Sequence, residues 1–124
     1  LIIGGVAGAL CYFAINLKMA FNYDDSLDVV AVHAVGGSWG AIATGLFATT
    51  AVNPAGRDGL FFGNPAQLGI QVISVVATIL YAFVMSWVLL KLVDMIMGLK
   101  VTEQDERIGL DLTQHRESGY TMLD

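Results

Sequence analysis

The stretch that decides the fold runs from residue 67 to residue 97 and reads QLGIQVISVVATILYAFVMSWVLLKLVDMIM. Residues 59–90, which include most of it, contain no Asp, Glu, Lys or Arg. About 20 consecutive apolar residues are enough to cross the hydrocarbon core of a bilayer as a helix. The stretch therefore predicts a membrane helix, and its length predicts that the helix is tilted or projects beyond the bilayer.

Two more charge-free runs, residues 1–17 and 29–56, precede this stretch. They predict membrane helices over about 1–17 and 27–48, with the third helix over about 67–97. The whole chain of 124 residues is 56% hydrophobic and 14% charged, whereas soluble domains carry about 25% charged residues. We therefore expect an all-α polytopic membrane protein. The chain begins at Leu1, inside an apolar run without the basic start of a signal peptide, so we expect further helices upstream.

The residues after the third helix differ in character from the rest of the chain. Residues 99–124 hold six acidic and three basic side chains, so we expect a membrane domain over 1–98 and a separate tail over 99–124. An acidic tail does not fit a nucleic-acid partner.

The basic residues near the helix ends predict the orientation of the chain. If three helices cross the membrane, Lys18, Lys91 and Lys100 fall on one side and Arg57 falls alone on the other. Basic residues near membrane helices are enriched on the cytoplasmic side, so we expect the C-terminal tail in the cytoplasm.

His33 is the only titratable side chain within the apolar body of the second helix. An ionisable residue in a membrane helix normally faces the protein interior or a water path, and it is most often functional. The alternative is a packed histidine that bonds to a neighbouring carbonyl group. Gly37, Ala41 and Gly45 recur every four residues in the same helix, which predicts a face that allows close packing or leaves a narrow conduit open.

Two motifs give this sequence a resemblance to a known family. Residues 24–48, DDSLDVVAVHAVGGSWGAIATGLFA, closely resemble the tenth membrane helix of the Amt/Mep ammonium transporters, where DD-x-x-D-x-x-x-x-H precedes a glycine-rich helix. Residues 98–120, GLKVTEQDERIGLDLTQHRESGY, resemble the cytoplasmic region that follows the family's last helix. The segments DGLFFG (58–63) and KLVDMIMGLKV (91–101) fit the same family.

The resemblance implies a plasma-membrane, multi-pass fold of about eleven helices in two inverted repeats, assembled as a homotrimer with one pore per subunit. The three helices here would be the last three. His33 matches the second histidine of the family's hydrogen-bonded pore pair. The implied function is transport of ammonium, conducted as ammonia, with a PII-type signalling protein as a possible cytoplasmic partner. Neither an enzymatic activity nor a cofactor is expected, and no phosphate-binding GxxxxGK[ST] loop is present in the sequence.

Four other residues match family positions that carry possible roles. Asp24, Asp25 and Asp28 match the acidic cluster of the pore-helix motif, which implies coupling of that helix to the cytoplasmic tail. Capping of the helix start is the alternative, and three carboxylates there do not make a complete metal site. Thr113 lies where plant members carry a regulatory phosphorylation site, and a helix-capping threonine is the alternative. The family's usual His-Gly is His115-Arg116 here, which leaves the geometry of that turn open.

Local signals predict three details around the tail. Gly98 is expected to end the third helix, and Thr102-x-x-Asp105 is expected to start a new one. Lys91 and Asp94, three residues apart on the third helix, are expected to form an ion pair.

Three alternatives to an ammonium transporter of this type remain open at the level of sequence. The first is an ammonium sensor on the same scaffold, although sensors usually carry an appended signalling domain and this chain ends at Asp124. The second is a non-transporting membrane subunit in which His33 is only packed. The third is the related Rh group, which the tail motif fits less well.

Overall fold

The computed structural model describes residues 1–21 and 24–119, so Asn22 in the first linker and the end of the tail, residues 120–124, lie outside the described residues. The chain divides into two compact units, Leu1–Tyr81 and Ala82–Asp124. All regular elements of the described residues are helical, and the bounds of these elements follow in chain order: α1 (Ile2–Ala20), η1 (Val30–Val35, a π-helix), α2 (Gly36–Phe47), η2 (Leu60–Phe62, a 3₁₀-helix), α3 (Pro65–Met97), α4 (Glu103–Ile108) and η3 (Asp111–His115, a π-helix).

Three helices of the described part are long and apolar enough to cross a membrane: Ile2–Ala20, Val30–Phe47 and Pro65–Met97. The prediction of an all-α fold with three membrane helices is thereby confirmed. The first helix ends three residues beyond the predicted range, because an apolar stem lets Lys18 lie within a helix end. The third begins two residues earlier, at Pro65, where a helix tolerates proline since the first N–H groups have no helical partner.

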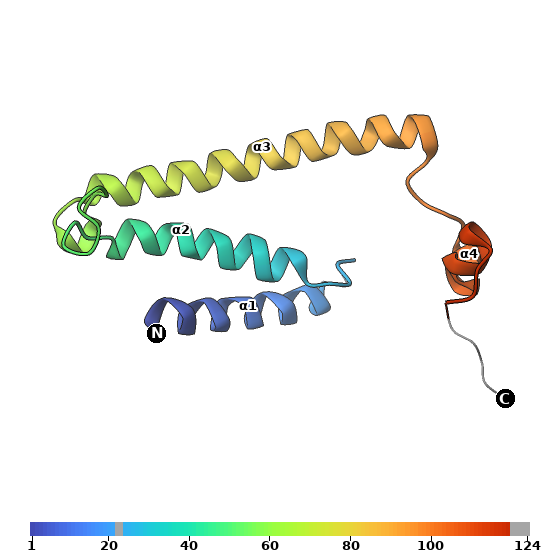
Figure 1. The fold of residues 1–124 in the computed structure, drawn as a ribbon, viewed down its shortest axis with the longest axis horizontal. Coiled ribbons are helices and arrows are strands. Elements are labelled where there is room, and N and C mark those ends of the chain that lie inside the picture. The colour runs from blue at the N-terminus through green and yellow to red at the C-terminus, as the bar shows by residue number, and fades with distance from the viewer. Residues whose placement is uncertain (22–23, 120–124) are drawn as a thin grey trace. The chain divides into compact units, whose positions relative to one another are not determined.

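The helices α1 and α2 lie side by side in the first unit (Figure 1). Their contact is close because Gly36 has no side chain: a Cβ atom there would lie 3.1 Å from the Cys11 sulfur. The Trp39 indole N–H also donates a hydrogen bond to the Ile3 carbonyl oxygen at 2.9 Å. Small residues and interhelical hydrogen bonds are the usual means of packing helices in lipid.

The loop between α2 and α3 folds back on the end of α2. The Thr50 amide donates to the Asp58 carboxylate at 2.7 Å, and the Gly59 amide donates to the Ala48 carbonyl at 2.8 Å. The Phe47 and Phe61 rings pack with their centroids 5.1 Å apart. The Thr50 amide is also the main cause of a lowered pKa for the Asp58 carboxyl.

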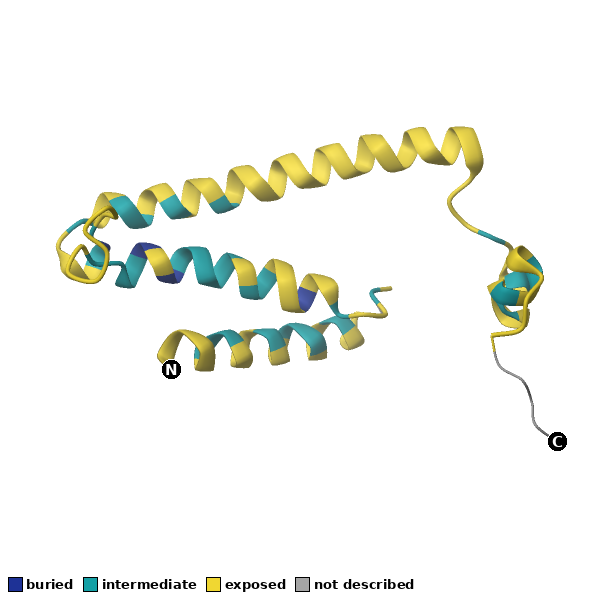
Figure 2. Cartoon of the chain, viewed as in Figure 1, coloured by how far each residue is buried: buried dark blue, intermediate teal, exposed yellow. Residues whose placement is uncertain are grey.

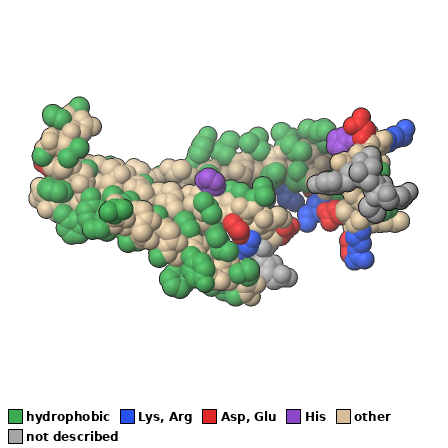
Figure 3. All heavy atoms as spheres, turned by 60° about the horizontal axis from the view of Figure 1, so that its bottom comes forward, with side chains coloured by type: hydrophobic (Ala, Val, Ile, Leu, Met, Phe, Trp, Pro, Cys, Tyr) green, Lys and Arg blue, Asp and Glu red, His purple; other side chains and the backbone are tan. Residues whose placement is uncertain are grey.

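Most hydrophobic side chains of the first unit remain uncovered by the described residues. Ala31 and Ala43 are the buried hydrophobic residues of the described chain, and α3 is exposed along nearly all of its length (Figure 2). Hydrophobic side chains spread over the surface of the helices in the space-filling view (Figure 3). Such surfaces require lipid or further protein around them, as expected of a membrane protein.

The second unit contains the end of α3 and the tail elements. Gly98 adopts φ 77° and its amide donates to the Asp94 carbonyl, so the predicted end of α3 is confirmed. Thr102 accepts a hydrogen bond from the Asp105 amide at 3.2 Å and caps α4, as predicted. The predicted ion pair of Asp94 is wrong: its carboxylate instead accepts from the Leu99 amide at 3.2 Å, because that N–H has no partner within the helix.

Candidate functional site

His33 lies in η1, the π-helical turn through which the chain enters α2. π-helical turns are rare and occur frequently at functional sites. The His33 side chain is exposed, and its ring nitrogens have no hydrogen-bond partner among residues 1–21 and 24–119. The ring is therefore not a packed histidine bonded to a carbonyl of the described chain.

The face of α2 that continues from His33 is nearly free of side chains. Gly37 and Gly40 follow at helical spacing, and a Cβ atom added at either would meet nothing within 4 Å. Gly45, by contrast, packs on α3: its Cβ would lie 2.9 Å from the Leu68 Cα atom. The predicted Gly37–Ala41–Gly45 face is thus divided, with Gly45 against α3 and Gly37 on the uncovered side with His33.

The acidic residues of the linker hold the start of this helix. The Asp25 carboxylate accepts hydrogen bonds from the Val29 amide at 3.0 Å and from the Val30 amide at 2.9 Å. It thus satisfies backbone donors that a helix start otherwise leaves unpaired. Asp28 adopts φ 55° and forms an ion pair with Lys18, whereas Asp24 is exposed and has no bonding partner in the described chain.

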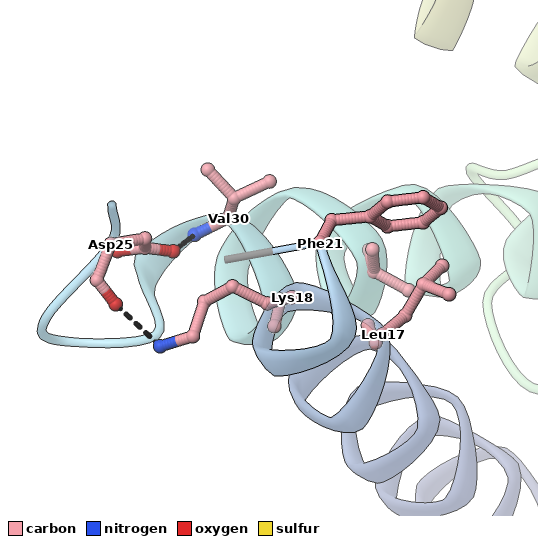
Figure 4. A pocket seen from close by; sticks show the side chains of 8 residues that line it. Leu17, Lys18, Phe21, Asp25 and Val30 are labelled. Carbon is pink, nitrogen blue, oxygen red and sulfur yellow. Dashed lines mark hydrogen bonds between the residues drawn. The ribbon is translucent and has the colours of Figure 1, made fainter. Parts of the chain in front are cut away.

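Lys18 joins the end of α1 to this linker. Its ammonium group donates to the Asp25 carbonyl oxygen at 2.6 Å (Figure 4). The same group also forms an ion pair with Asp28. A partly open cavity of about 410 Å³ lies beside these contacts, and it is lined by Ala14, Leu17, Lys18, Phe21, Asp25, Val30, Ala31 and Val35. The sequence predicts a role of Lys18 in orientation but not these contacts, because a linear motif does not show which carboxylate a lysine contacts.

The tail places Thr113 within a short, hydrogen-bonded turn. Its hydroxyl donates to the Gly109 carbonyl oxygen at 3.0 Å, four residues back, so it does not cap a helix start. Asp111 closes the turn by accepting from the Gly119 amide at 2.8 Å, and this bond is the main cause of a lowered pKa of its carboxyl.

The backbone of Arg116 shows the geometry of the turn in which the family's usual His-Gly is His115-Arg116 here. It adopts the left-handed conformation, φ 57° and ψ 30°, at the end of η3. Arginine thus adopts a left-handed conformation that suits glycine, at a cost of about 1–2 kcal/mol relative to glycine.

Comparison with known proteins identifies the group to which these features belong. The model of the Ammonium Transporter Family matches residues 1–120. The chain belongs to the ammonium transporter family. It is 46% identical over 121 residues to an ammonium transporter of Bacillus subtilis and 46% identical over 121 residues to ammonium transporter Amt1 of Archaeoglobus fulgidus. An ammonium transporter of Aquifex aeolicus is 42% identical over 121 residues.

The matches cover nearly all of this chain but only part of each relative. They include 97% of the chain for the Bacillus and Aquifex proteins and 98% for the Archaeoglobus protein. The chain spans about 30% of the length of these ammonium transporters. It is thus a multi-pass membrane member of the family, and it corresponds to about a third of such a transporter.

Proposed function

We propose that this chain forms the last three membrane helices of a longer protein that conducts ammonium across the plasma membrane as ammonia. In this proposal His33 is the second of two hydrogen-bonded histidines in the pore. Its partner comes from a helix outside this chain. Family membership supports the transport function. The observation that supports the site is that the His33 imidazole has no partner among residues 1–21 and 24–119 and lies on the uncovered side of a membrane-length helix, near two glycines.

The physical basis of the proposal is the difference in solvation between ammonium and ammonia. Moving a bare cation into an apolar passage costs many kcal/mol, whereas a neutral molecule of the same size crosses with a far smaller loss. A neutral imidazole has one donor and one acceptor nitrogen, and a hydrogen bond between two such rings fixes the tautomer of each. The pair then offers one donor and one acceptor to a small polar guest. Potassium has no proton to release, so it stays excluded.

The glycines beside His33 suit a partner helix that brings a second ring close. Gly37 is one turn beyond His33 and Gly40 nearly two turns beyond. A face of small residues lets two helix backbones approach until short side chains meet. A larger residue at either position would hold the partner helix away from the imidazole.

We further infer that the complete protein is a homotrimer, with Lys18 and the tail on the cytoplasmic side and Arg57 outside. The tail is then accessible to a kinase at Thr113 or to a PII-type protein. Addition of a phosphate would replace the bond from the Thr113 hydroxyl to Gly109 with a group of nearly two negative charges. Coupling of the pore helix to the tail through Asp24, Asp25 and Asp28 is part of the same proposal.

The test is substitution of His33 in the full-length transporter, reconstituted in vesicles and assayed for methylammonium uptake. Loss of a buried hydrogen-bonding partner costs about 1–3 kcal/mol, so we expect His33→Ala to reduce uptake by roughly tenfold or more. His115→Ala is the matched control, because it removes the other histidine of this chain from the exposed tail and should leave uptake unchanged. Wild-type uptake and wild-type exclusion of potassium in His33→Ala would overturn the pore assignment.

A further inference from the structure

Lys18, near the end of α1, contacts the linker that leads into the helix carrying His33. The Lys18 ammonium donates to the Asp25 carbonyl oxygen at 2.6 Å and pairs with the Asp28 carboxylate. The two side chains of the ion pair are 18% and 34% exposed, so the contact is partly shielded from water. Figure 4 shows the Lys18 side chain extending from the end of α1 to the Asp25 carbonyl oxygen of the linker, and both residues line the cavity.

Both residues that Lys18 contacts determine where the helix begins. The carboxylate of Asp25 holds the Val29 and Val30 amides, and the Asp28 carbonyl accepts from the Val32 amide at 2.9 Å. Asp28 also holds a left-handed backbone conformation, which is unfavourable for residues other than glycine and least so for Asp and Asn. Lys18 therefore stabilises the one linker geometry from which η1 starts in its observed register.

The direction of the His33 ring depends on that register. A slip of one residue in the helix start turns each following side chain by about 100° around the helix axis. The Cys11 thiol approaches the Val32 carbonyl, one residue before His33, at 3.8 Å, and Gly36, three residues after His33, packs on the Cys11 sulfur. The π-helical turn is thus contacted from α1 by Lys18 just before it begins and by Cys11 at Val32 and just after it ends.

We propose that Lys18 is a positioning residue for the pore imidazole: it fixes the start of η1 and thereby the direction in which the His33 ring points. This inference rests on the proposed function, since it assigns Lys18 to the same site. It differs from the role of Lys18 in orienting the chain, because charge alone orients a membrane helix and any basic residue nearby would serve.

The experiment compares Lys18→Met, Lys18→Arg and the control Lys91→Met in the full-length transporter. Lys91 is an exposed lysine of α3 that has no carboxylate within ion-pair distance in the described part of the chain. The readouts are methylammonium uptake as a function of concentration and the ¹⁵N solid-state NMR signals of the His33 ring, assigned by their absence in His33→Gln.

We expect Lys18→Met to lower the maximal uptake rate by about tenfold or more without changing the half-saturating concentration, because misplacing a reacting group by about 1 Å costs up to roughly 100-fold. The His33 ring signals should shift or split into two tautomers. Lys18→Arg should restore both readouts to near wild type, and Lys91→Met should change neither.

A second variant keeps the test decisive if Lys18→Met does not fold. Asp28→Asn removes the ion pair but keeps a residue that tolerates the left-handed conformation, so it should shift the His33 signals in the same direction by a smaller amount. Unchanged His33 signals in the folded variants overturn the inference, whether or not uptake falls. If His33→Ala itself transports normally, the proposed function fails, whereas normal transport in Lys18→Met with an inactive His33→Ala defeats only the role of Lys18.

Discussion

The Asp111 carboxylate illustrates how single residues shape the tail. It accepts from the Gly119 amide, and Gly109 lies so close that a Cβ atom there would be 2.6 Å from the Asp111 Oδ1 atom. Gly109 also has φ 110°, a conformation that side chains disfavour. The positive φ therefore favours glycine at this position, and a Cβ atom there would also require the Asp111 carboxylate that closes the turn to shift.

The lowered pKa of Asp111 predicts that the tail turn is acid-sensitive. Its carboxylate is stabilised by backbone N–H donors, first that of Gly119, so the charged form contributes stability above the ordinary carboxyl pKa of about 3.9. That contribution is lost as the pH falls through the lowered pKa of the folded state. Amide exchange of Gly119, measured from about pH 6 to about pH 2, should accelerate at the acid end beyond the intrinsic trend. Asp111→Asn should show no such transition, and an identical profile in both proteins would contradict the assignment.

At the level of elements, the membrane helices could be predicted from the sequence because absence of charge over a membrane-length run is a direct physical requirement. The exact ends of the helices could not be predicted. The apolar stem of Lys18 lets α1 continue to Ala20, and the first turn of a helix tolerates proline, so α3 begins at Pro65. The π-helical turn around His33 could not be predicted, because hydrophobic spacing over six residues does not distinguish it from an α-helix.

The joint between α2 and the following loop depends on Gly59. A Cβ atom at this position would lie 2.7 Å from the Gly45 carbonyl oxygen and 2.8 Å from that of Leu46. These are backbone atoms of a helix and cannot move aside easily. Gly59→Ala should therefore destabilise the full-length protein by about 1–3 kcal/mol, seen as a lower thermal midpoint in detergent.

The control for this substitution is Gly69→Ala in α3. A Cβ atom at Gly69 would meet nothing within 4 Å, and alanine is a better helix former than glycine by up to about 1 kcal/mol. We expect no loss of stability there. Equal midpoints for Gly59→Ala and the wild type would show that the joint is less tight than the distances indicate.

At the scale of the whole molecule, the proposed orientation places the α1–α2 linker and the tail on one side and the α2–α3 loop on the other. Single cysteines at Ser26, Ala55 and Gln114 in a full-length protein without other cysteines test it directly, since all three residues are exposed. An impermeant thiol reagent added to intact cells should label the cysteine at position 55 and spare the other two. Labelling at position 114 from outside would reverse the assigned orientation.

The candidate site could be predicted from the sequence only in part. His33 could be singled out because an ionisable group in an apolar helix is costly and therefore informative. The contacts of Lys18 with Asp25 and Asp28 could not be predicted, because they depend on how α1 packs against the linker. No described residue hydrogen-bonds to the His33 ring, so pairing of two histidines stays a prediction.

The unbroken course of α3 has a mechanical consequence. Its 33 residues make a rod of about 50 Å, against about 30 Å of hydrocarbon, and no proline or π-turn interrupts it after Pro65. A helix of this length must tilt or extend beyond the hydrocarbon core, and Gly98, with its positive φ, is the first position where the backbone leaves the helix and the tail begins.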